Sequence, residues 1–393
     1  MFSMRKIGLL FAAIVSTCIP FSQAWSNQGV SANEIVIGSI LDLSGPVAST
    51  GQQGRNGMQM RVDEINAAGG INGRKLRLIA EDSGYDPKKA LLAAQKLVHR
   101  DRVFAVIGTL GTPPMATSLP TIMEGGVPHL FPIALHKMAS EPLSPLKFAM
   151  ANTYDDQMQA SVRWIVKQKG FKRVCIFYQD DDLGHEIMRG AEAGLKEVGL
   201  EVIDRASYKR GALDFSSQMA RLKASNCDLV VLGAVVRETI SAAQEVRKLG
   251  WDVALLGSAP SYSPEIIEIG GAASEGIYAA NSFMLPFAVQ ERASPELERW
   301  IADYRKRFGQ DPKLGSVMGY TAIGLFADAA KRAGSNLDAG SLAKALETLT
   351  VAPDFLGNGE FRFSPTDHVG SRYVRVHQVK DGKWVAVSGF LEK

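Results

Sequence analysis

Short apolar runs alternate with amphipathic segments along most of this chain. The run Glu34–Leu41 (EIVIGSIL) has the length and the branched side chains of a buried strand. In the following segment Arg55–Asn66, the residues Met58, Val62 and Ile65 recur at helical spacing. Apolar strands separated by amphipathic helices are typical of a parallel sheet that helices cover on both faces. The pattern therefore predicts an α/β fold.

The alternation occurs twice, which predicts two lobes, each about the size of one domain. The first series contains the expected strands and helices Glu34–Leu41, Arg55–Asn66, Lys75–Ala80, Lys88–Val98, Val103–Ile107, Met115–Met123 and Val127–Phe131. The second series contains Gln157–Gln168, Arg173–Tyr178, Glu186–Val198, Glu201–Ser207, Phe215–Ala224, Asp228–Gly233, Glu238–Leu249 and Val253–Leu256. A strand, two helices and three short strands are expected after it, at Ile277–Ser282, Pro295–Phe308, Val317–Ala330, Gly359–Phe363, Tyr373–Val379 and Trp384–Val387.

Ligands of open parallel sheets bind beyond the carboxyl ends of the strands. The loops that follow five of the expected strands are therefore candidate binding loops: Leu43–Gly54, Gly108–Met115, Pro132–Met138, Gln179–Gly184 and Gly233–Arg237.

The stretch GTLGTPPM (108–115) carries glycines that let the backbone approach a ligand closely. Pro113 and Pro114 favour the first turn of a helix but remove two N–H donors that a phosphate would need. We therefore expect a weakly polar solute at this loop. Gly51, Gly54 and Gly57 do not have the G-x-G-x-x-G spacing, so no nucleotide is expected, and we interpret them as a turn before the helix.

The segment Met1–Ala24 has the features of a cleaved secretory signal. Arg5 and Lys6 precede a short apolar run, and small residues stand at −3 and −1 of the expected cleavage site. A buried N-terminal helix is the alternative, and Thr17 before Cys18 fits a lipid anchor poorly. No later segment approaches the roughly 20 apolar residues of a membrane-spanning helix. We expect an exported, periplasmic protein.

Charge and cysteine content limit the partners. The formal net charge is +3 (44 basic against 41 acidic residues), and loss of Arg5 and Lys6 leaves +1. This balance predicts no nucleic-acid surface. Cys175 and Cys227 lie in or beside apolar strands, and we interpret them as buried free thiols, with a disulfide as the alternative. Two cysteines and scattered histidines give no metal cluster of recognisable spacing.

Six motifs spread over the chain carry a family resemblance. They are LSGPVASTG, EINAAGGINGRKL, DPKKA, VIGTLGTP, FSSQMARLKASNCDLVVLGA and MGYTAIGLFADAA. Together they resemble the periplasmic branched-chain amino-acid-binding proteins, the extracytoplasmic receptors of ABC importers. The resemblance covers roughly Asn33 to the end of the chain. It implies two Rossmann-like lobes with a ligand cleft between them and crossovers near Thr153, Phe283 and Ser364. Lobe 1 would comprise 25–152 and 284–364, and lobe 2 would comprise 153–283 and 365–393.

The resemblance also implies which positions face the ligand. In the loop after the third strand, Leu110, Gly111 and Thr112 take the places that grip a ligand carboxylate, and Thr112 keeps the hydroxyl. In the loop after the fourth strand, Ala134 and Leu135 take the places of a small residue and a threonine, so a second hydroxyl is missing.

The positions that surround an α-ammonium in the family are not kept. Val235 and Ala259 match a tyrosine and a glutamate, and a further tyrosine is absent near Leu183. A desolvated ammonium without a carboxylate partner costs several kcal/mol. We therefore expect that the protein does not bind a free α-amino acid.

The expected site is apolar and partly aromatic. Tyr154 and Tyr320 could form flat walls, with packing in the core as the alternative role. His136, Arg237 or Arg55 could supply positive charge to a carboxylate, with a solvated surface role as the alternative. The predicted ligand-binding residues are Thr50, Leu110, Gly111, Thr112, Ala134, Leu135, His136, Tyr154, Leu183, Val235, Arg237 and Tyr320.

These features predict a monomeric solute receptor that closes by hinge motion on a small, largely apolar ligand, with an aromatic or branched-chain carboxylate favoured over a free amino acid. Its partners would be that ligand and an ABC permease in the inner membrane, and neither a catalytic role nor a cofactor is expected. Three alternatives remain: binding of branched-chain or other amino acids, an extracytoplasmic sensor on the same fold, and an exported Rossmann-type enzyme.

Overall fold

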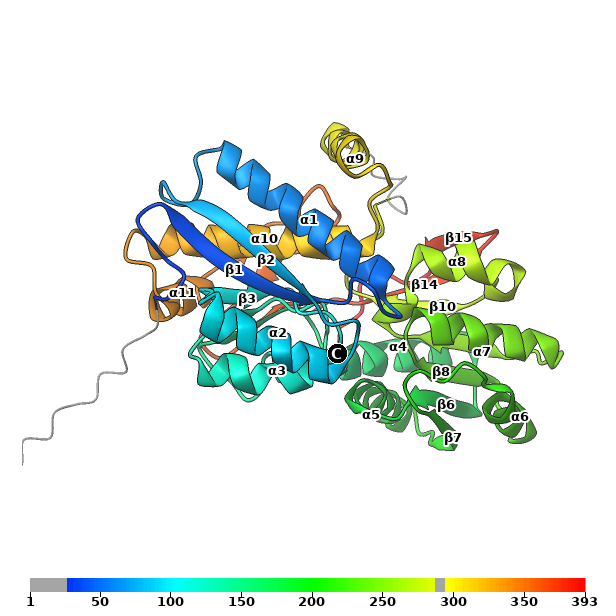
Figure 1. Cartoon of the computed structure of the whole chain (residues 1–393). Coiled ribbons are helices and arrows are strands. Elements are labelled where there is room, and N and C mark those ends of the chain that lie inside the picture. Colours follow the sequence, from blue (N-terminus) through cyan, green and yellow to red (C-terminus); the bar gives the residue numbers. More distant parts are fainter. Residues whose placement is uncertain (1–26, 287–293, 393) are drawn as a thin grey trace, which may run out of the picture.

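Two lobes, each built on one sheet with helices on both faces, make up the molecule (Figure 1). The structure is a computed structural model and describes residues 27–286 and 294–392. The predicted signal Met1–Ala24 lies outside the described residues. The α/β fold expected from the alternation of strands and helices is confirmed.

The first sheet is parallel throughout, in the order β13-β5-β4-β3-β1-β2. Its strands are β1 (Glu34–Leu41), β2 (Lys75–Asp82), β3 (Ala105–Ile107), β4 (His129–Leu130), β5 (Lys147–Ala151) and β13 (Val369–Ser371). Ile35 and Ile37 of β1 pack towards helices α1 (Ala48–Ala67) and α10 (Leu314–Ala333). Val36 and Ile40 pack on the other face, towards α2 (Pro87–Gln95) and α3 (Thr112–Glu124). Burial on both faces explains the unbroken apolar run of β1.

The second sheet has the order β15-β14-β10-β9-β8-β6-β7 and turns antiparallel only at the β14 and β15 edge. Its strands are β6 (Val174–Gln179), β7 (Val202–Tyr208), β8 (Leu229–Gly233), β9 (Ala254–Gly257), β10 (Tyr278–Asn281), β14 (Arg375–Lys380) and β15 (Lys383–Ala386). Helices α4 (Tyr154–Lys169) and α5 (Asp182–Lys196) cover one face, and α6 (Ser216–Ala224) and α7 (Val236–Lys248) cover the other.

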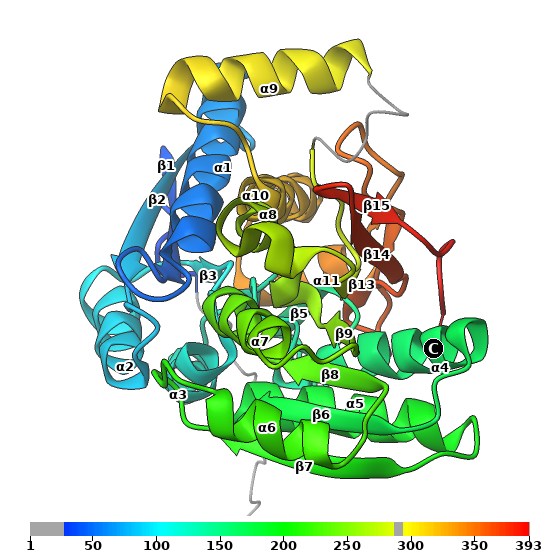
Figure 2. The same ribbon diagram turned by 90° about the vertical axis from the view of Figure 1, so that its right-hand side faces the viewer.

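Further elements complete the two lobes. They are α8 (Pro264–Gly270), α9 (Pro295–Phe308), α11 (Ala339–Leu346), and the two-stranded ribbon β11 (Thr350–Val351) and β12 (Phe361–Arg362). Helix α9 lies across α1, as Figure 2 shows, and Tyr304 of α9 donates a hydrogen bond of 2.7 Å to Gln53 of α1.

Helices α1 and α10 lie side by side with their backbones in contact. A Cβ atom added to Gly57 would lie 2.1 Å from the carbonyl oxygen of Ser316, and one added to Gly319 would lie 2.2 Å from that of Gly54. Only glycine fits at these positions, because no side chain can occupy the space between the two helices. Gly54 and Gly57, which the sequence analysis interpreted as part of a turn, therefore belong to a helix-to-helix contact.

The predicted start of this helix at Arg55 is wrong. Helix α1 begins at Ala48, so that Gly51, Gly54 and Gly57 lie inside it. These glycines interrupt the apolar spacing that would indicate a helix in the sequence. They are nevertheless needed, because other backbone segments pack closely against them. A Cβ atom on Gly51 would lie 1.7 Å from the carbonyl oxygen of Asp42.

The chain passes between the two sheets three times. The passages follow β5, follow β10, and separate β13 from β14. The third passage was expected near Ser364. It lies after Ser371, because the three-residue strand β13 pairs with β5 of the first sheet.

Cys175 and Cys227 form a disulfide, with their Cα atoms 5.9 Å apart. The interpretation of these residues as free thiols is corrected. Cys175 lies in β6, and Cys227 lies just before β8, which pairs with β6. Sequence spacing cannot show that the two cysteines are neighbours, since they are 52 positions apart in the chain.

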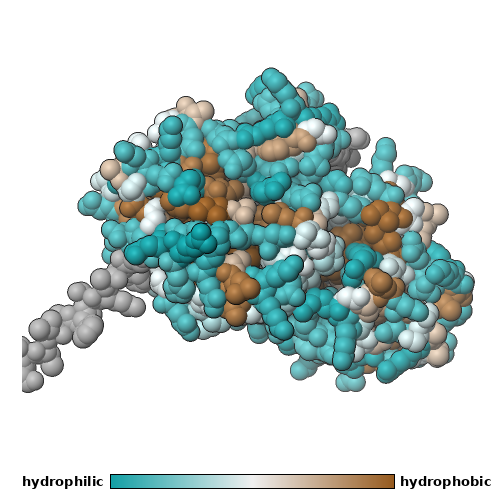
Figure 3. Space-filling model, viewed as in Figure 1, coloured by the Kyte–Doolittle hydropathy of each residue, from teal (hydrophilic) through white to brown (hydrophobic). Residues whose placement is uncertain are grey.

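Hydrophilic residues cover most of the face seen in Figure 3, and smaller hydrophobic patches interrupt them on both lobes. Within the described ranges, no helix is both long enough and apolar enough to span a membrane.

Candidate ligand-binding site

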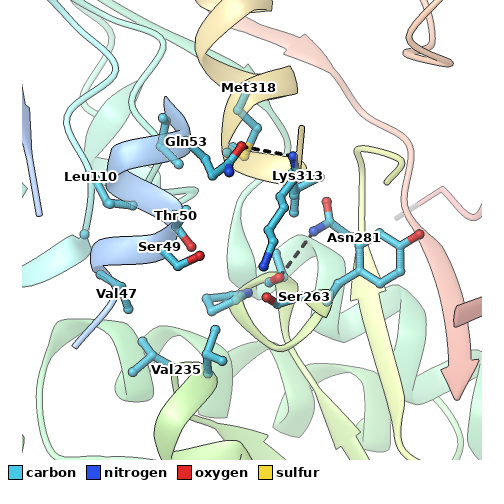
Figure 4. Close-up of a pocket in the computed structure, with 18 of the residues that line it drawn as sticks. Val47, Ser49, Thr50, Gln53, Leu110, Val235, Ser263, Asn281, Lys313 and Met318 are labelled. Atoms are coloured by element: carbon cyan, nitrogen blue, oxygen red, sulfur yellow. Dashed lines mark hydrogen bonds between the residues drawn. The ribbon is translucent and has the colours of Figure 1, made fainter. Parts of the chain in front are cut away.

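A cavity lies between the lobes, beyond the carboxyl ends of strands from both sheets. The starts of α1 and α10 and the loop after β3 line it from the first lobe, and the starts of α5, α7 and α8 line it from the second. In Figure 4, Thr50 and Met318 belong to the first-lobe side, and Val235 and Ser263 belong to the opposite side.

Most of the cavity wall is apolar. These side chains are Val47, Leu110, Ile133, Leu135, Leu183, Val235, Val236, Ala259, Leu314 and Met318. The cavity volume is about 80 Å³, which is several times the minimum that holds one water molecule. The cavity therefore has room for a small solute. No cluster of His, Cys, Asp and Glu able to hold a metal occurs in the described part of the chain.

Three tyrosines bring hydroxyl groups into this apolar space. They are Tyr85, Tyr154 and Tyr262, and all three are buried. Burial raises the pKa of each of these phenols above its ordinary value, so the hydroxyls are neutral at physiological pH. They can donate and accept hydrogen bonds without adding charge.

The buried carboxylate of Asp42 fixes the start of α1 against the cavity. It accepts hydrogen bonds from the backbone N–H groups of Gly45 (2.5 Å) and Val47 (2.8 Å). These bonds fold the chain between β1 and α1 into a tight turn. Val47, the N-cap residue of α1, and Thr50, in its first turn, thereby line the cavity.

The GTLGTPPM loop brings its backbone close to Tyr85. Gly111 has a φ of +95°, and a Cβ atom at this residue would lie 2.5 Å from the Tyr85 ring. Thr112 is the first residue of α3, and its hydroxyl lies beside that of Tyr154. The backbone N–H of Leu135 points to the same tyrosine hydroxyl. Groups from both lobes therefore meet at one end of the cavity.

The cavity brings together eight of the twelve predicted ligand-binding residues. They are Thr50, Leu110, Gly111, Thr112, Leu135, Tyr154, Leu183 and Val235. Ala259, which the family resemblance also indicated, lines it as well.

Ala134 and Tyr320 lie away from the cavity. Ala134 is packed in a small core with Met115 and Ala149. The Tyr320 hydroxyl donates a hydrogen bond of 2.6 Å to Glu64. Tyr320 follows the cavity residue Met318 by two positions on a helix, and about 200° of rotation takes it to another face.

His136, Arg237 and Arg55 do not line the cavity either. The Nε2 atom of His136 lies 2.9 Å from the Glu186 carboxylate. Arg237 forms an ion pair with its neighbour Glu238, and Arg55 is exposed. These side chains therefore contact other protein groups or face solvent.

Tyr85 is a cavity residue that the sequence analysis missed. It is 4% exposed and has a φ of +60°, a conformation that is rare for a bulky residue. Strained backbone of this kind persists where surrounding contacts hold it, and it gathers at binding sites. A tyrosine directly after Gly84 in the loop that follows β2 was the available signal.

A polar network across the lobes was also missed. The Nζ atom of Lys313, at the start of α10, lies 2.6 Å from a carboxylate oxygen of Glu265 in α8. Ser49 of α1 donates to the same oxygen at 2.5 Å, and Ser263 donates to the other. In sequence these residues have the polar character of ordinary helix starts, so only the fold brings them together.

The extent of the match to one family decides the identity of the chain. Residues 34–383 match the family described as "Periplasmic binding protein". The chain belongs to the periplasmic binding protein family. It is a solute-binding protein of an ABC transporter, it has no enzymatic role, and the family implies a membrane permease as its partner. The resemblance found in the motifs is confirmed.

Individual relatives cover nearly the whole chain. Leu/Ile/Val-binding protein homolog 7 of Brucella suis biovar 1 is 26% identical over 398 residues, which is 97% of this chain and 95% of that protein. The structure of a fatty acid ABC transporter substrate-binding protein from Thermomonospora curvata has a TM-score of 0.82 and 26% identity, covering 93% of this chain and 94% of that one.

A third relative is a solute-binding protein from R. palustris in complex with benzoate. It has a TM-score of 0.80 and 18% identity, and the match covers 91% of this chain and 96% of that one. A sequence identity of 18% shows only that the two proteins share a fold.

Proposed function

We propose that this receptor binds a small, largely apolar carboxylate that lacks a free α-ammonium and delivers it to its permease. One observation carries the proposal. Among the described residues that line the cavity, Glu265 is the only acidic side chain, and Lys313, Ser49 and Ser263 already donate to it. A ligand ammonium would lose its water shell without gaining a free carboxylate partner, which costs several kcal/mol.

The wall of the cavity supports an apolar ligand body. Branched side chains line the cavity from both lobes, for example Leu110 and Val235, and the tyrosine rings offer flat surfaces. Two of the similar structures are named for a fatty acid transporter and for a benzoate complex. These names support a carboxylate on an aliphatic or aromatic body.

The carboxylate is assigned to the end of the cavity where Thr112, Tyr154 and Leu135 meet. Two hydroxyls and one backbone N–H there are neutral donors. Neutral donors in a buried site can hold a carboxylate without a cation, because hydrogen bonds to a charged acceptor are strong. Pro113 and Pro114 leave few other N–H groups at the start of α3.

Closure of the lobes completes this site, since each lobe supplies part of the wall. The open form would admit the solute, and closure would bury it and present both lobes to the permease. We also propose that Met1–Ala24 directs export and is cleaved from the mature chain.

Isothermal titration of the mature protein tests the proposal. We expect 4-methylpentanoate and benzoate to bind and leucine to bind at least about tenfold more weakly, a difference of about 1.4 kcal/mol. Leucine and 4-methylpentanoate share one carbon skeleton, so the comparison isolates the ammonium. Tighter binding of leucine than of 4-methylpentanoate would show that the amino-acid alternative, suggested by the Leu/Ile/Val names of relatives, is correct.

A further inference from the structure

Lys313 reaches across the cleft to the acidic side chain in the cavity wall. Its backbone N–H donates to Gln53 of α1 at 3.1 Å, which ties it to the first lobe (Figure 4). Its Nζ atom lies 2.6 Å from Glu265 and 3.2 Å from Glu268, both on α8 of the second lobe. The lysine and Glu265 both line the ligand cavity.

The carboxylate of Glu265 has little capacity left for a ligand. A carboxylate has about four lone-pair positions. Lys313 and Ser49 donate to one oxygen, Ser263 donates to the other, and the backbone N–H of Glu265 contributes a fourth bond. Burial alone would raise the pKa of Glu265, but these hydrogen bonds bring it below its ordinary value, so the group is charged and paired.

This pair is more protected than a surface ion pair. The side chains of Lys313 and Glu265 are 24% and 13% exposed. Partly desolvated pairs with several hydrogen bonds are held in one geometry, whereas exposed pairs contribute little. A ligand ammonium would therefore have to displace Lys313 to reach Glu265.

We propose that Lys313 determines specificity by occupying Glu265, and thereby excludes solutes that carry an ammonium group from a cavity that contains a carboxylate. This inference rests on the proposed function, and it assigns the exclusion of ammonium-bearing solutes to Lys313. Removing the lysine charge should leave Glu265 available as an acceptor and convert the cavity to one that accepts ammonium-bearing solutes.

The test uses Lys313→Met, which keeps an unbranched apolar stem, and two ligand pairs measured by isothermal titration. The pairs are 4-methylpentanoate with leucine, and pentanoate with 5-aminopentanoate, whose ammonium lies at the far end. We expect at least one ammonium-bearing ligand to bind the variant about tenfold or more tighter than it binds the parent. The affinity for the ammonium-free ligands should change less than about threefold, which is under 1 kcal/mol.

Two controls make the result specific. The double variant Lys313→Met/Glu265→Gln should lose the gain, because the freed acceptor is then neutral. Lys331→Met, at the exposed far end of the same helix, should bind every ligand as the parent does. Lys313→Gln serves as a second single variant if the methionine variant does not fold.

Each failure has a different meaning. A parent protein that prefers leucine overturns the proposed function. A parent that excludes leucine, with a folded Lys313 variant that gains no ammonium-bearing ligand, overturns this inference alone. A variant that loses the ammonium-free ligands more than about tenfold also overturns it, because Lys313 then contacts the ligand carboxylate itself.

Discussion

The Nε2 atom of His136 lies 2.9 Å from the carboxylate of Glu186, and the two residues come from different lobes. His136 follows β4 of the first sheet, whereas Glu186 lies in α5 and has no exposed surface. The other oxygen of Glu186 accepts from the backbone N–H of Lys137 at 2.9 Å. A buried carboxyl group thus joins the lobes beside the cavity.

Stability should fall with rising pH because of Glu186. Burial raises its pKa to about 7, nearby Asp155 adds to this, and the contact with His136 offsets only part of the effect. A carboxyl group with a raised pKa stabilises the fold below its unfolded pKa and loses that contribution as pH rises through 7. We expect Glu186→Gln to gain stability relative to the parent from pH 5 to pH 8, by up to about 3 kcal/mol.

Chemical denaturation at a series of pH values measures this difference. Glu192→Gln, which removes a partly exposed carboxylate of the same helix that pairs with Arg205, is the control for the loss of one negative charge and a surface ion pair. A difference between Glu186→Gln and the parent that does not change with pH would contradict the prediction.

Thr112→Val should weaken binding of the carboxylate ligand. The substitution keeps the shape of the side chain but removes one of the hydroxyls at the proposed carboxylate end. Loss of a hydrogen bond to a charged group predicts a decrease of roughly tenfold or more in affinity. Titration with 4-methylpentanoate checks this, with Thr121→Val on the same helix as the control. Equal affinities for the parent and Thr112→Val would exclude Thr112 as an anchor.

Gly319→Ala should destabilise the first lobe. The added methyl group would lie 2.2 Å from the Gly54 carbonyl oxygen, which belongs to the backbone and cannot rotate away. We expect a loss of roughly 1–3 kcal/mol in the free energy of unfolding. Gly324→Ala is the matched control on the same helix, since its nearest neighbour is the Arg61 side chain at 3.7 Å.

Gly324→Ala should instead gain about 0.5–1 kcal/mol in the free energy of unfolding, because alanine has a higher helix propensity than glycine. Urea unfolding measures both changes. A Gly319→Ala variant as stable as the parent would show that the two helices can separate without loss.

Removing the Cys175–Cys227 disulfide should cost stability. The bond closes a loop of 52 residues, for which the loss of chain entropy predicts about 4 kcal/mol. We expect the double variant Cys175→Ala/Cys227→Ala to unfold at a lower denaturant concentration than the oxidised parent. A reductant should lower the stability of the parent and leave the double variant unchanged. If a thiol-reactive reagent labelled both Cys175 and Cys227 in the unfolded parent without a reductant, the disulfide would be contradicted.

The fold could be predicted from the sequence because both sheets are buried on both faces. Strands such as β1 and β8 then have continuous apolar runs, and the helices between them have one apolar face. Short elements lack that signal. Strand β13 has three residues and α8 has seven, too few to show a period.

The site could be predicted only where ligand loops follow apolar strands. Leu110 and Thr112 meet that rule, and they line the cavity. Lys313 and Glu265 lie at helix starts, where polar residues are common for reasons unrelated to ligands. Tyr320 was expected in the wall, but its position around the helix follows from how α10 packs on its neighbours.

Helices α1 and α10 touch through their backbones and both begin at the cavity. Thr50 and Lys313 therefore lie on one rigid pair of helices. Trimming side chains cannot bring these helices closer, and a methyl group added at Gly57 or Gly319 would force them apart. The second lobe has one similar pair, since a Cβ atom on Gly190 or Gly194 of α5 would lie 2.3 or 2.5 Å from a carbonyl oxygen of α4. Val235 and Glu265 lie outside that pair, at the starts of α7 and α8. New ligand preferences in this protein should therefore arise by substitution at the starts of α7 and α8, against two glycine-packed helix pairs that keep their shape.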